Sequence, residues 1–212
     1  MKEKDTLFQD KDDETLTIFS IGHSNQSMEA FLSLLQQHKI EVLIDVRSYP
    51  YSKYVPHFNS TSLATAVKQV GIRYIFMGKE LGGRPDGDKF YDVDSHVLYN
   101  RVAEASFFLS AIKRVKRGGR AYRVAMMCSE EDPTGCHRHL LIGRVLAKQG
   151  VNLSHIRGDG HIQTEKELAF PKEIASYGQS LWDEQPSKKE ENTWRSIRPV
   201  SRKKQQPSSS DL

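Results

Sequence analysis

The two cysteines of this 212-residue chain lie in one short segment, residues 128–138, which also holds a histidine and an arginine. Cys128 and Cys136 flank an acidic turn, and Cys136 is followed directly by His137 and Arg138. Such residues could form a disulfide, bind a metal ion, supply a nucleophilic thiol, or present polar groups to a ligand at a strand-to-helix turn. The surrounding sequence supports some of these four hypotheses and argues against others.

The sequence argues against a structural disulfide. Two cysteines do not make the framework of a secreted protein, and the first residues contain no apolar signal segment. We therefore expect a cytoplasmic protein with reduced cysteines. A phosphatase-like loop would place an arginine six residues after Cys128, but that position is Thr134, and the turn carries three carboxylates. A nucleophilic Cys128 is one alternative, and a small buried strand residue is the other.

Zinc is a further hypothesis for the same residues, with His23 as an additional ligand. The spacing of Cys128, Cys136 and His137 matches none of the usual short zinc motifs. Side chains that are adjacent at the start of a helix are also expected to point in different directions. We accordingly predict no metal ion and no other cofactor.

Segments typical of strands and helices alternate along the chain. The apolar runs that predict strands are residues 15–21, 41–46, 72–77, 121–128 and 151–156. The segments whose apolar spacing predicts helices are residues 28–40, 62–70, 95–117 and 136–149. The third helix is expected to end at the pair Gly118–Gly119. This order predicts an α/β fold, a three-layer sandwich in which a mainly parallel sheet of about five strands has helices on both faces.

One hydrophobic core is expected, because 37% of the residues are hydrophobic and the charged residues gather towards the ends. We predict a single α/β domain over residues 15–181, a disordered leader at 1–14 and a basic, disordered tail at 182–212. No apolar run reaches the roughly 18 to 20 residues of a membrane helix, so we expect no membrane contact. The net charge of +4 permits a polyanionic partner without demanding one.

Polar or glycine-rich residues follow four of the predicted strands. In open parallel sheets ligands bind outside the carboxyl ends of the strands, so these four exits could form one shared site. The residues that we predict to act there are His23 and Ser24; Asp45, Arg47 and Ser48; Glu80, Gly82, Gly83 and Arg84; and Cys128, Glu130, Cys136, His137 and Arg138. Loops at such positions are also commonly polar without function.

Four of these residues are candidate acid–base groups. Asp45 or Glu130 could activate a water or stabilise a developing cation, and His23 or His137 could carry the proton. Arginines from separate exits could bind a planar or phosphorylated anion through forked donors, and the glycine pair of the third exit would let the backbone approach it closely. Ion pairs between these acids and arginines could instead have a purely structural role and hold neighbouring loops together.

An aromatic and basic loop follows the second strand, at residues 47–59. Its aromatic and basic side chains are Tyr49, Tyr51, Lys53, Tyr54, His57 and Phe58. Aromatic faces that alternate with cations can stack unpaired bases and hold their phosphates. Tyrosines that merely cover the edge of a sheet would give the same pattern.

Several of these motifs together resemble the DUF488 family, which is named for a domain of unknown function. The matching residues are Gly22-His23-Ser24, Asp45-Val46-Arg47 with Ser48, Pro50 and Ser52, Phe58, Glu80-Leu81-Gly82-Gly83-Arg84, Cys128-Ser129-Glu130 and Cys136-His137-Arg138. They lie in the expected order, although Ser129 stands where many relatives have alanine, and the chain after about Leu181 lies outside the resemblance. The resemblance implies the fold and the location of the site, and some family members carry a DNA-repair label.

We expect an intracellular enzyme that acts hydrolytically on a nucleotide or on the base or sugar of a nucleic acid. Ser52, Tyr54 and Phe58 complete the predicted ligand-binding residues. Two alternatives stay open: a non-catalytic module that binds nucleic acid or nucleotides, and a cysteine-dependent thiol or redox enzyme. The oligomeric state is not predicted.

Overall fold

The computed structural model describes residues 15–168 and 194–201 of the chain. The predicted leader at residues 1–14 and most of the predicted tail, residues 182–193 and 202–212, lie outside the described residues.

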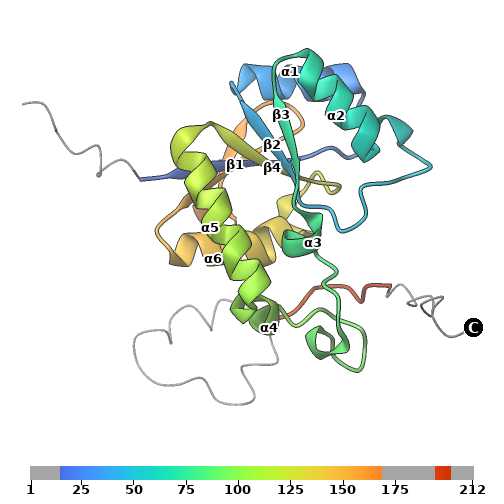
Figure 1. The fold of residues 1–212 in the computed structure, drawn as a ribbon, viewed down its shortest axis with the longest axis vertical. Helices are drawn as coiled ribbons and strands as arrows, with labels where there is room; N and C mark the ends of the chain where they lie inside the picture. Colours follow the sequence, from blue (N-terminus) through green and yellow to red (C-terminus); the bar gives the residue numbers. More distant parts are fainter. Residues whose placement is uncertain (1–14, 169–193, 202–212) are drawn as a thin grey trace, which may run out of the picture.

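A six-stranded sheet forms the centre of the fold (Figure 1). The strands are β1 (Thr17–Gly22), β2 (Val42–Asp45), β3 (Arg73–Phe76), β4 (Val124–Cys128), β5 (Asn152–Ile156) and β6 (Ile162–Thr164). Their order across the sheet is β3-β2-β4-β1-β5-β6, and every neighbouring pair is parallel except β5 and β6. The predicted α/β fold and mainly parallel sheet are confirmed, and β6 is an antiparallel edge strand that the sequence analysis did not identify.

Helices cover both faces of this sheet, as predicted. They are α1 (Met28–Gln37), α2 (Ser60–Gln69), α3 (Gly78–Leu81), α4 (Tyr99–Glu104), α5 (Ser106–Ala121) and α6 (Arg144–Lys148). In Figure 1, α1 and α2 lie on one side of the strands, and α5 and α6 lie on the other. Each helical layer covers its own hydrophobic cluster.

The alternation of side chains along β4 divides its residues between these two clusters. Val124, Met126 and Cys128 belong to the cluster that includes α5 and α6, whereas Ala125 and Met127 belong to the cluster under α1 and α2. All five residues are buried. The last residue of the strand, Cys128, therefore directs its thiol to the α5 side of the sheet.

The prediction of one helix over residues 95–117 is wrong, because two shorter helices, α4 and α5, occupy this region. Ala105 separates them with an extended backbone (φ −68°, ψ 135°). Before α4, Leu98 forms a β-bridge with Arg195, and Tyr99 donates its backbone N–H to the carbonyl of Trp194. A partner that is distant in sequence thus supplies strand-like hydrogen bonds to residues whose local pattern predicts a helix.

The glycine pair Gly118–Gly119 does not end the helix as predicted, since α5 continues to Ala121. Phe108, Ile112 and Val115 of α5 are buried against the sheet. Burial of these side chains outweighs the roughly 1 kcal/mol that each glycine costs inside a helix.

Residues 194–201, which the sequence analysis assigned to a disordered tail, lie against the domain. Trp194 is only 4% exposed, and its indole Nε1 donates to the carbonyl of Leu140 at 2.8 Å. The backbone N–H of Ser196 donates to the carbonyl of Val97, and the backbone N–H of Val97 donates to the hydroxyl of Ser196, both at 2.9 Å. This segment is therefore held in place beside α4.

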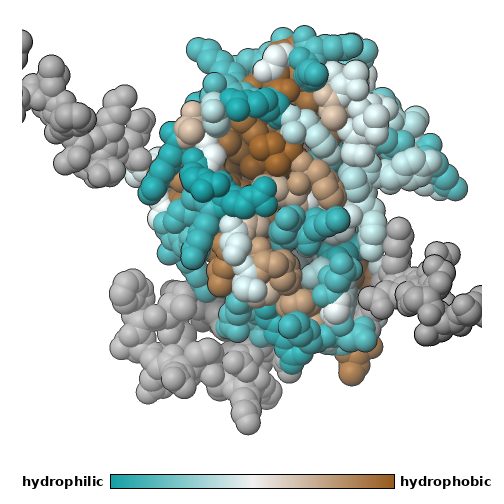
Figure 2. Space-filling model, viewed as in Figure 1, coloured by the Kyte–Doolittle hydropathy of each residue, from teal (hydrophilic) through white to brown (hydrophobic). Residues whose placement is uncertain are grey.

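The open edge of the sheet at β3 carries apolar side chains on the surface. Ile75 and Phe76 are 39% and 37% exposed. Figure 2 shows an apolar area among hydrophilic side chains where β3 lies in the view of Figure 1. Among the described residues, no helix has the length and apolar character needed to cross a membrane.

Replacement of the buried indole tests whether the C-terminal segment is part of the domain. Trp194→Ala is expected to lower the free energy of unfolding by about 3–5 kcal/mol, because a buried aromatic side chain and its hydrogen bond are lost. Ile197→Ala, in the same segment but at a side chain that is 51% exposed, should change it by about 0.5 kcal/mol or less. Urea unfolding followed by fluorescence and circular dichroism measures both, and equal small effects would contradict the docked segment.

Candidate functional site

The carboxyl ends of β1, β2 and β4 lie level with one another. The strand register pairs Gly22 with Cys128 and Asp45 with Met127. Just beyond the strands, the backbone N–H of His23 donates to the carbonyl of Cys128 at 3.0 Å. The loops that follow these strands therefore start side by side at one edge of the sheet, where ligands bind in open α/β folds.

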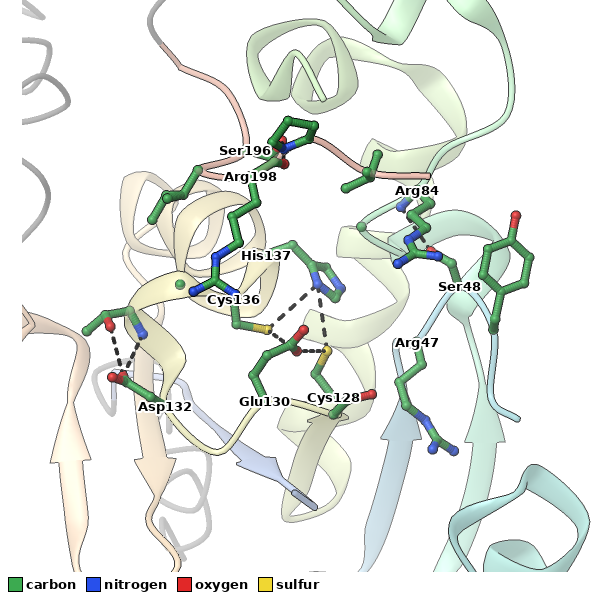
Figure 3. Close-up of a pocket in the computed structure, with 18 of the residues that line it drawn as sticks. Arg47, Ser48, Arg84, Cys128, Glu130, Asp132, Cys136, His137, Ser196 and Arg198 are labelled. Atoms are coloured by element: carbon green, nitrogen blue, oxygen red, sulfur yellow. Dashed lines mark hydrogen bonds between the residues drawn. The ribbon is translucent and has the colours of Figure 1, made fainter. Parts of the chain in front are cut away.

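A pocket opens at this edge (Figure 3). Its volume of about 980 Å³ is sufficient for a nucleotide-sized ligand. Its walls come from the loop after β2, from Gly83 and Arg84 beyond α3, from Tyr99 of α4, from the turn after β4 and from residues 196–200. Three of the four predicted loops thus converge on one cavity, together with a C-terminal segment that the sequence analysis did not place there.

Two thiols, an imidazole and a carboxylate meet at the floor of the pocket (Figure 3). His137 Nδ1 lies 3.8 Å from the Sγ of Cys128 and 3.7 Å from the Sγ of Cys136. Oε2 of Glu130 lies 2.9 Å and 3.3 Å from the same two sulfur atoms. Both cysteines are free thiols and are buried. Four reactive groups from one turn thus share a small volume that faces the pocket.

The orientation of the imidazole follows from its other nitrogen. His137 Nε2 lies 3.2 Å from the carbonyl oxygen of Val46. Because a carbonyl can only accept a hydrogen bond, Nε2 carries the proton in the neutral ring, and the lone pair of Nδ1 faces the two sulfur atoms.

The prediction that Cys136 and His137 point in different directions is wrong. Cys136 has an extended backbone (φ −104°, ψ 143°), whereas His137 is already helical (φ −60°, ψ −20°). This change of conformation between neighbours brings both side chains to the same point. The helix predicted to start at residue 136 accordingly begins one residue later and continues through a π-helical stretch, Arg138–Gly143, into α6.

The close packing of these groups shifts their pKa values. A hydrogen bond from Cys136 lowers the pKa of the Cys128 thiol to about 6 against the effect of burial, and His137 contributes to the decrease. Burial raises the pKa of Cys136 well above its usual value. Burial alone would lower the pKa of His137, but the neighbouring Cys128 outweighs it and raises that pKa. The two thiols therefore differ in acidity, and Cys128 is the one that loses its proton more readily.

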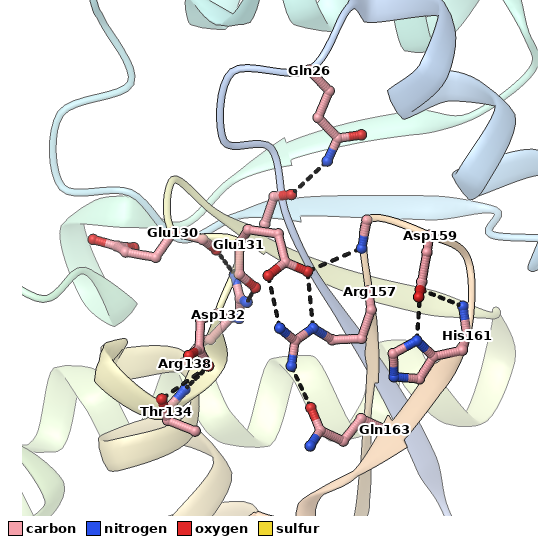
Figure 4. Close-up of polar contacts among 12 residues, drawn as sticks. Gln26, Glu130, Glu131, Asp132, Thr134, Arg138, Arg157, Asp159, His161 and Gln163 are labelled. Atoms are coloured by element: carbon pink, nitrogen blue, oxygen red, sulfur yellow. Dashed lines mark hydrogen bonds and ion pairs between the residues drawn. The ribbon is translucent and has the colours of Figure 1, made fainter.

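Among the three acids of the turn, Glu130 is the one that faces the sulfur atoms. Glu131 forms an ion pair with Arg157 at 2.7 Å, which lowers the pKa of Glu131 (Figure 4). Asp132 accepts hydrogen bonds from the backbone N–H and the hydroxyl of Thr134, both at 2.9 Å. Within the described residues, Glu131 is therefore the one acid of the three whose charge is paired with a cation, and both Glu131 and Asp132 line the pocket together with Glu130.

Arg138 holds the turn in place from below. It is 0% exposed, and its two terminal nitrogens donate to the backbone carbonyls of Glu130 and Glu131 (Figure 4). At Gly22 a Cβ atom would lie 1.7 Å from the Glu130 carbonyl oxygen, so the approach of this carbonyl requires glycine. Arg138, a predicted ligand-binding residue, does not line the pocket and acts on the backbone of the turn.

Asp45 and His23, two predicted acid–base residues, lie behind the pocket wall. Asp45 accepts hydrogen bonds from Arg47 Nε and Nη2 at 2.9 and 2.6 Å and from the hydroxyl of Tyr74 at 2.7 Å. The ring of His23 stacks on Phe58 at 4.3 Å, and its Nε2 lies 3.0 Å from Arg47 Nη1. Burial lowers the pKa of His23 to about 4, which keeps the ring neutral. These groups connect β1, β2 and β3 to the aromatic loop.

The other predicted residues divide between the pocket and its surroundings. The predicted residues that line the pocket are Arg47, Ser48, Gly83, Arg84, Cys128, Glu130, Cys136 and His137. Those that do not line it are His23, Ser24, Asp45, Ser52, Tyr54, Phe58, Glu80, Gly82 and Arg138. Tyr54 is 83% exposed, and Glu80 forms a surface ion pair with Arg114 at 3.6 Å.

The loops around the pocket are tied together by small residues. The Ser48 hydroxyl accepts a hydrogen bond from the backbone N–H of Arg84 at 2.9 Å. A Cβ atom at Gly82 would lie 2.3 Å from that hydroxyl oxygen, and one at Gly83 would lie 3.0 Å from the ring of His137. The glycine pair therefore brings the third loop against the imidazole.

Two arginines direct their guanidinium groups towards the pocket, Arg84 and Arg198 (Figure 3). The Arg84 guanidinium lies 5.6 Å from the centre of the Tyr49 ring. The Arg47 guanidinium instead turns away from the pocket and pairs with Asp45 (Figure 3). Arg198 is not among the predicted site residues, because its segment is predicted to be a disordered tail; the nearby Trp194 is the signal that could have identified a docked segment.

This fold and this pocket define an α/β protein with a site at the carboxyl edge of a parallel sheet. Residues 27–145, more than half of the chain, match the family model described as "Domain of unknown function DUF488". The chain belongs to the DUF488 family. No curated protein and no solved structure matched it in the comparisons.

Removal of the buried carboxylate tests the structural role of Asp45. Asp45→Ala is expected to lower the free energy of unfolding by about 3–5 kcal/mol, because the buried Arg47 charge loses its partner. Tyr74→Phe, which removes one hydrogen bond to the same carboxylate, should cost about 1 kcal/mol. Asp159→Ala, at a carboxylate that is 71% exposed, serves as the control. Urea denaturation measures all three, and an Asp45→Ala protein as stable as the control would show that the ion pair is dispensable.

Proposed function

We propose that the protein is a hydrolase that acts on a nucleotide, or on a base or sugar of a nucleic acid, bound in this pocket. The observation that carries the proposal is the pocket itself, in which the carboxylate of Glu130 and the guanidinium groups of Arg84 and Arg198 face one cavity of nucleotide size. An anion-binding wall and an acid–base group in the same pocket are the parts that such a reaction needs.

The walls of the pocket suit a substrate with both a ring and an anionic group. Guanidinium groups bind phosphate oxygens through paired N–H donors. No hydrogen bond or ion pair within the described chain engages the Arg198 guanidinium, so its donors are available to a ligand. Tyr49 and Tyr51 also line the pocket, and Tyr51 is 75% exposed at its rim. Aromatic rings beside cations favour nucleotides over simple anions.

Within the proposed reaction, Glu130 takes the proton of the attacking water, and His137 stabilises charge at the floor. Glu130 has this role because its carboxylate lies beside the two thiols at the floor of the pocket, whereas Glu131 is paired with Arg157. Asp45 and His23, expected from the sequence as further acid–base candidates, support the loops in this proposal, since neither lines the pocket.

The proposal also includes the cellular setting expected from the sequence. Two free thiols at 4% and 2% exposure are compatible with the reducing cytoplasm. A nucleic-acid substrate with an altered base would agree with a role in DNA repair.

A cysteine-dependent reaction is the second candidate, because the Sγ of Cys128 faces the pocket 3.8 Å from His137 Nδ1. In that case Cys128 would be the nucleophile and His137 its proton carrier. Cys128→Ser would then abolish turnover, whereas Cys136→Ser, which keeps a hydrogen-bond donor beside Cys128, would retain most of it.

Separate measurements of turnover and binding test the hydrolase. The full chain is incubated with nucleoside phosphates and with single-stranded oligonucleotides that carry normal or damaged bases, and products are identified by mass spectrometry. For any substrate found, Glu130→Gln should lower kcat by about 100-fold or more while binding persists, since general-base catalysis is lost. Arg198→Ala should weaken binding about tenfold or more, since a hydrogen bond to a charged group is lost.

The control is Arg117→Ala, which removes an exposed cation of α5 outside the pocket. It should change neither kcat nor affinity. Absence of both binding and product across the whole panel would overturn the proposed substrate class. Binding that depends on Arg198 without any product would instead support the non-catalytic binding module.

A further inference from the structure

We infer that Cys128, Cys136 and His137 form a binding site for one zinc ion, with a fourth coordination position open to the pocket. The inference goes beyond the proposed hydrolysis and does not depend on the identity of the substrate. It also revises the expectation from the sequence that these residues bind no metal.

The donor atoms already have the arrangement that zinc requires. One Nδ1 and two Sγ atoms all lie within 4.8 Å of one another. With Zn–S near 2.3 Å and Zn–N near 2.0–2.1 Å, tetrahedral geometry separates a sulfur from a nitrogen by roughly 3.5 Å. The observed separations from His137 Nδ1 are 3.8 Å to Cys128 and 3.7 Å to Cys136. Shifts of a few tenths of an ångström would therefore be enough to hold the ion.

The imidazole is oriented as in established zinc sites. Histidine ligands usually donate their outer N–H to a carbonyl or carboxylate, which fixes the ring and directs the other nitrogen at the metal. In this protein the outer nitrogen of His137, Nε2, lies 3.2 Å from the Val46 carbonyl. A backbone carbonyl just beyond the end of β2 gives the ring this orientation before any ion binds.

The chemistry of the donors selects the metal. Two thiolates and an imidazole suit zinc, whereas magnesium and calcium prefer oxygen ligands. Cys128, Cys136 and His137 are 4%, 2% and 8% exposed, so the site is shielded from bulk water on all sides except the pocket. On binding, each thiol releases its proton to solvent and coordinates as a thiolate.

The position of Glu130 indicates what the open coordination site would do. Its Oε2 lies 2.9 Å and 3.3 Å from the two sulfur atoms, next to the donors but outside the group of three. Catalytic zinc sites combine three protein ligands with a bound water, and a nearby carboxylate can take a proton from that water. Two thiolates beside a carboxylate also concentrate negative charge that a divalent cation neutralises.

Metal content measured on the full-length protein tests the inference independently of any activity. Protein purified without chelator should contain about one zinc per chain. Protein stripped with a chelator and titrated with Co²⁺ should develop a thiolate-to-cobalt charge-transfer band and the intense visible absorption of tetrahedral cobalt, both displaced by added Zn²⁺. Failure of the stripped wild-type protein to bind either ion would overturn the inference.

Variants identify the ligands. Cys136→Ser and His137→Gln should each lower zinc affinity at least about tenfold. His161→Gln is the matched control, because this histidine is exposed at the surface and lies outside the group of three. Circular dichroism confirms that each variant is folded. If the folded ligand variants kept wild-type affinity, the ion would bind elsewhere and the assignment would be wrong.

The metal measurements also separate this inference from the proposed hydrolysis. If the three residues bind zinc but no nucleotide yields a product, the zinc site stands and the proposed substrate class is rejected. Nucleotide hydrolysis by protein that binds no zinc would support the substrate class and reject the zinc site. Loss of turnover in both Cys128→Ser and Cys136→Ser would agree with a metal site, whereas a nucleophilic thiol requires loss in the first variant only.

Discussion

The buried guanidinium of Arg138 is the contact on which the rest of the site depends. It donates to the backbone carbonyls of Glu130 and Glu131 and so fixes the turn between Cys128 and Cys136 over the sheet. A fully buried cation needs several acceptors to offset its lost hydration, and carbonyls of an irregular turn need donors. The two terminal nitrogens of Arg138 and these carbonyls satisfy each other, and the side chain of Glu130 turns to the two thiols at the floor of the pocket.

The sheet positions the other half of the cluster. Strict alternation along β4 places Cys128 on the α5 side, and the parallel register sets it beside Gly22 and near the end of β2. The carbonyl of Val46 is therefore available to orient His137. Cys136 and His137 reach the same point because the backbone changes from extended to helical between them. The site is thus a joint product of strand register and one irregular turn.

Two groups of residues lie at the pocket: those that line the cavity and those that hold its loops together. Asp45 and Arg47 form a buried pair that Tyr74 and His23 extend, and this network joins three strands to the aromatic loop. The cations that face the cavity come instead from exposed segments, at Arg84 and Arg198. An acid and an arginine two residues apart at a strand end can look catalytic in sequence, but burial decides which partner each one has.

Local patterns were sufficient for much of the fold. Apolar runs identified β1 to β5, and the spacing in residues 28–40 and 62–70 identified α1 and α2. The single helix expected at residues 95–117 is divided into α4 and α5, and it starts only at Tyr99 because Leu98 pairs with Arg195 almost a hundred residues away. The strand β6 is only three residues long and gave no periodic signal. Local periodicity carries no information about hydrogen bonds to distant segments. Those bonds determine whether short or weakly predicted helices and strands form.

The sequence by itself determined the α/β class, the edge of the sheet where the site lies, and the turn that carries both thiols, His137 and Glu130. It could do so because strand and helix periods, and the rule that parallel strands present their carboxyl ends together, depend on residues close in the chain. Only the tertiary structure decided that Cys136 and His137 converge, that Asp45 faces Arg47 rather than a ligand, and that Arg198 reaches the pocket. Each of these depends on contacts between distant segments, and the free energy of burying a charge or an aromatic ring there outweighs any local preference.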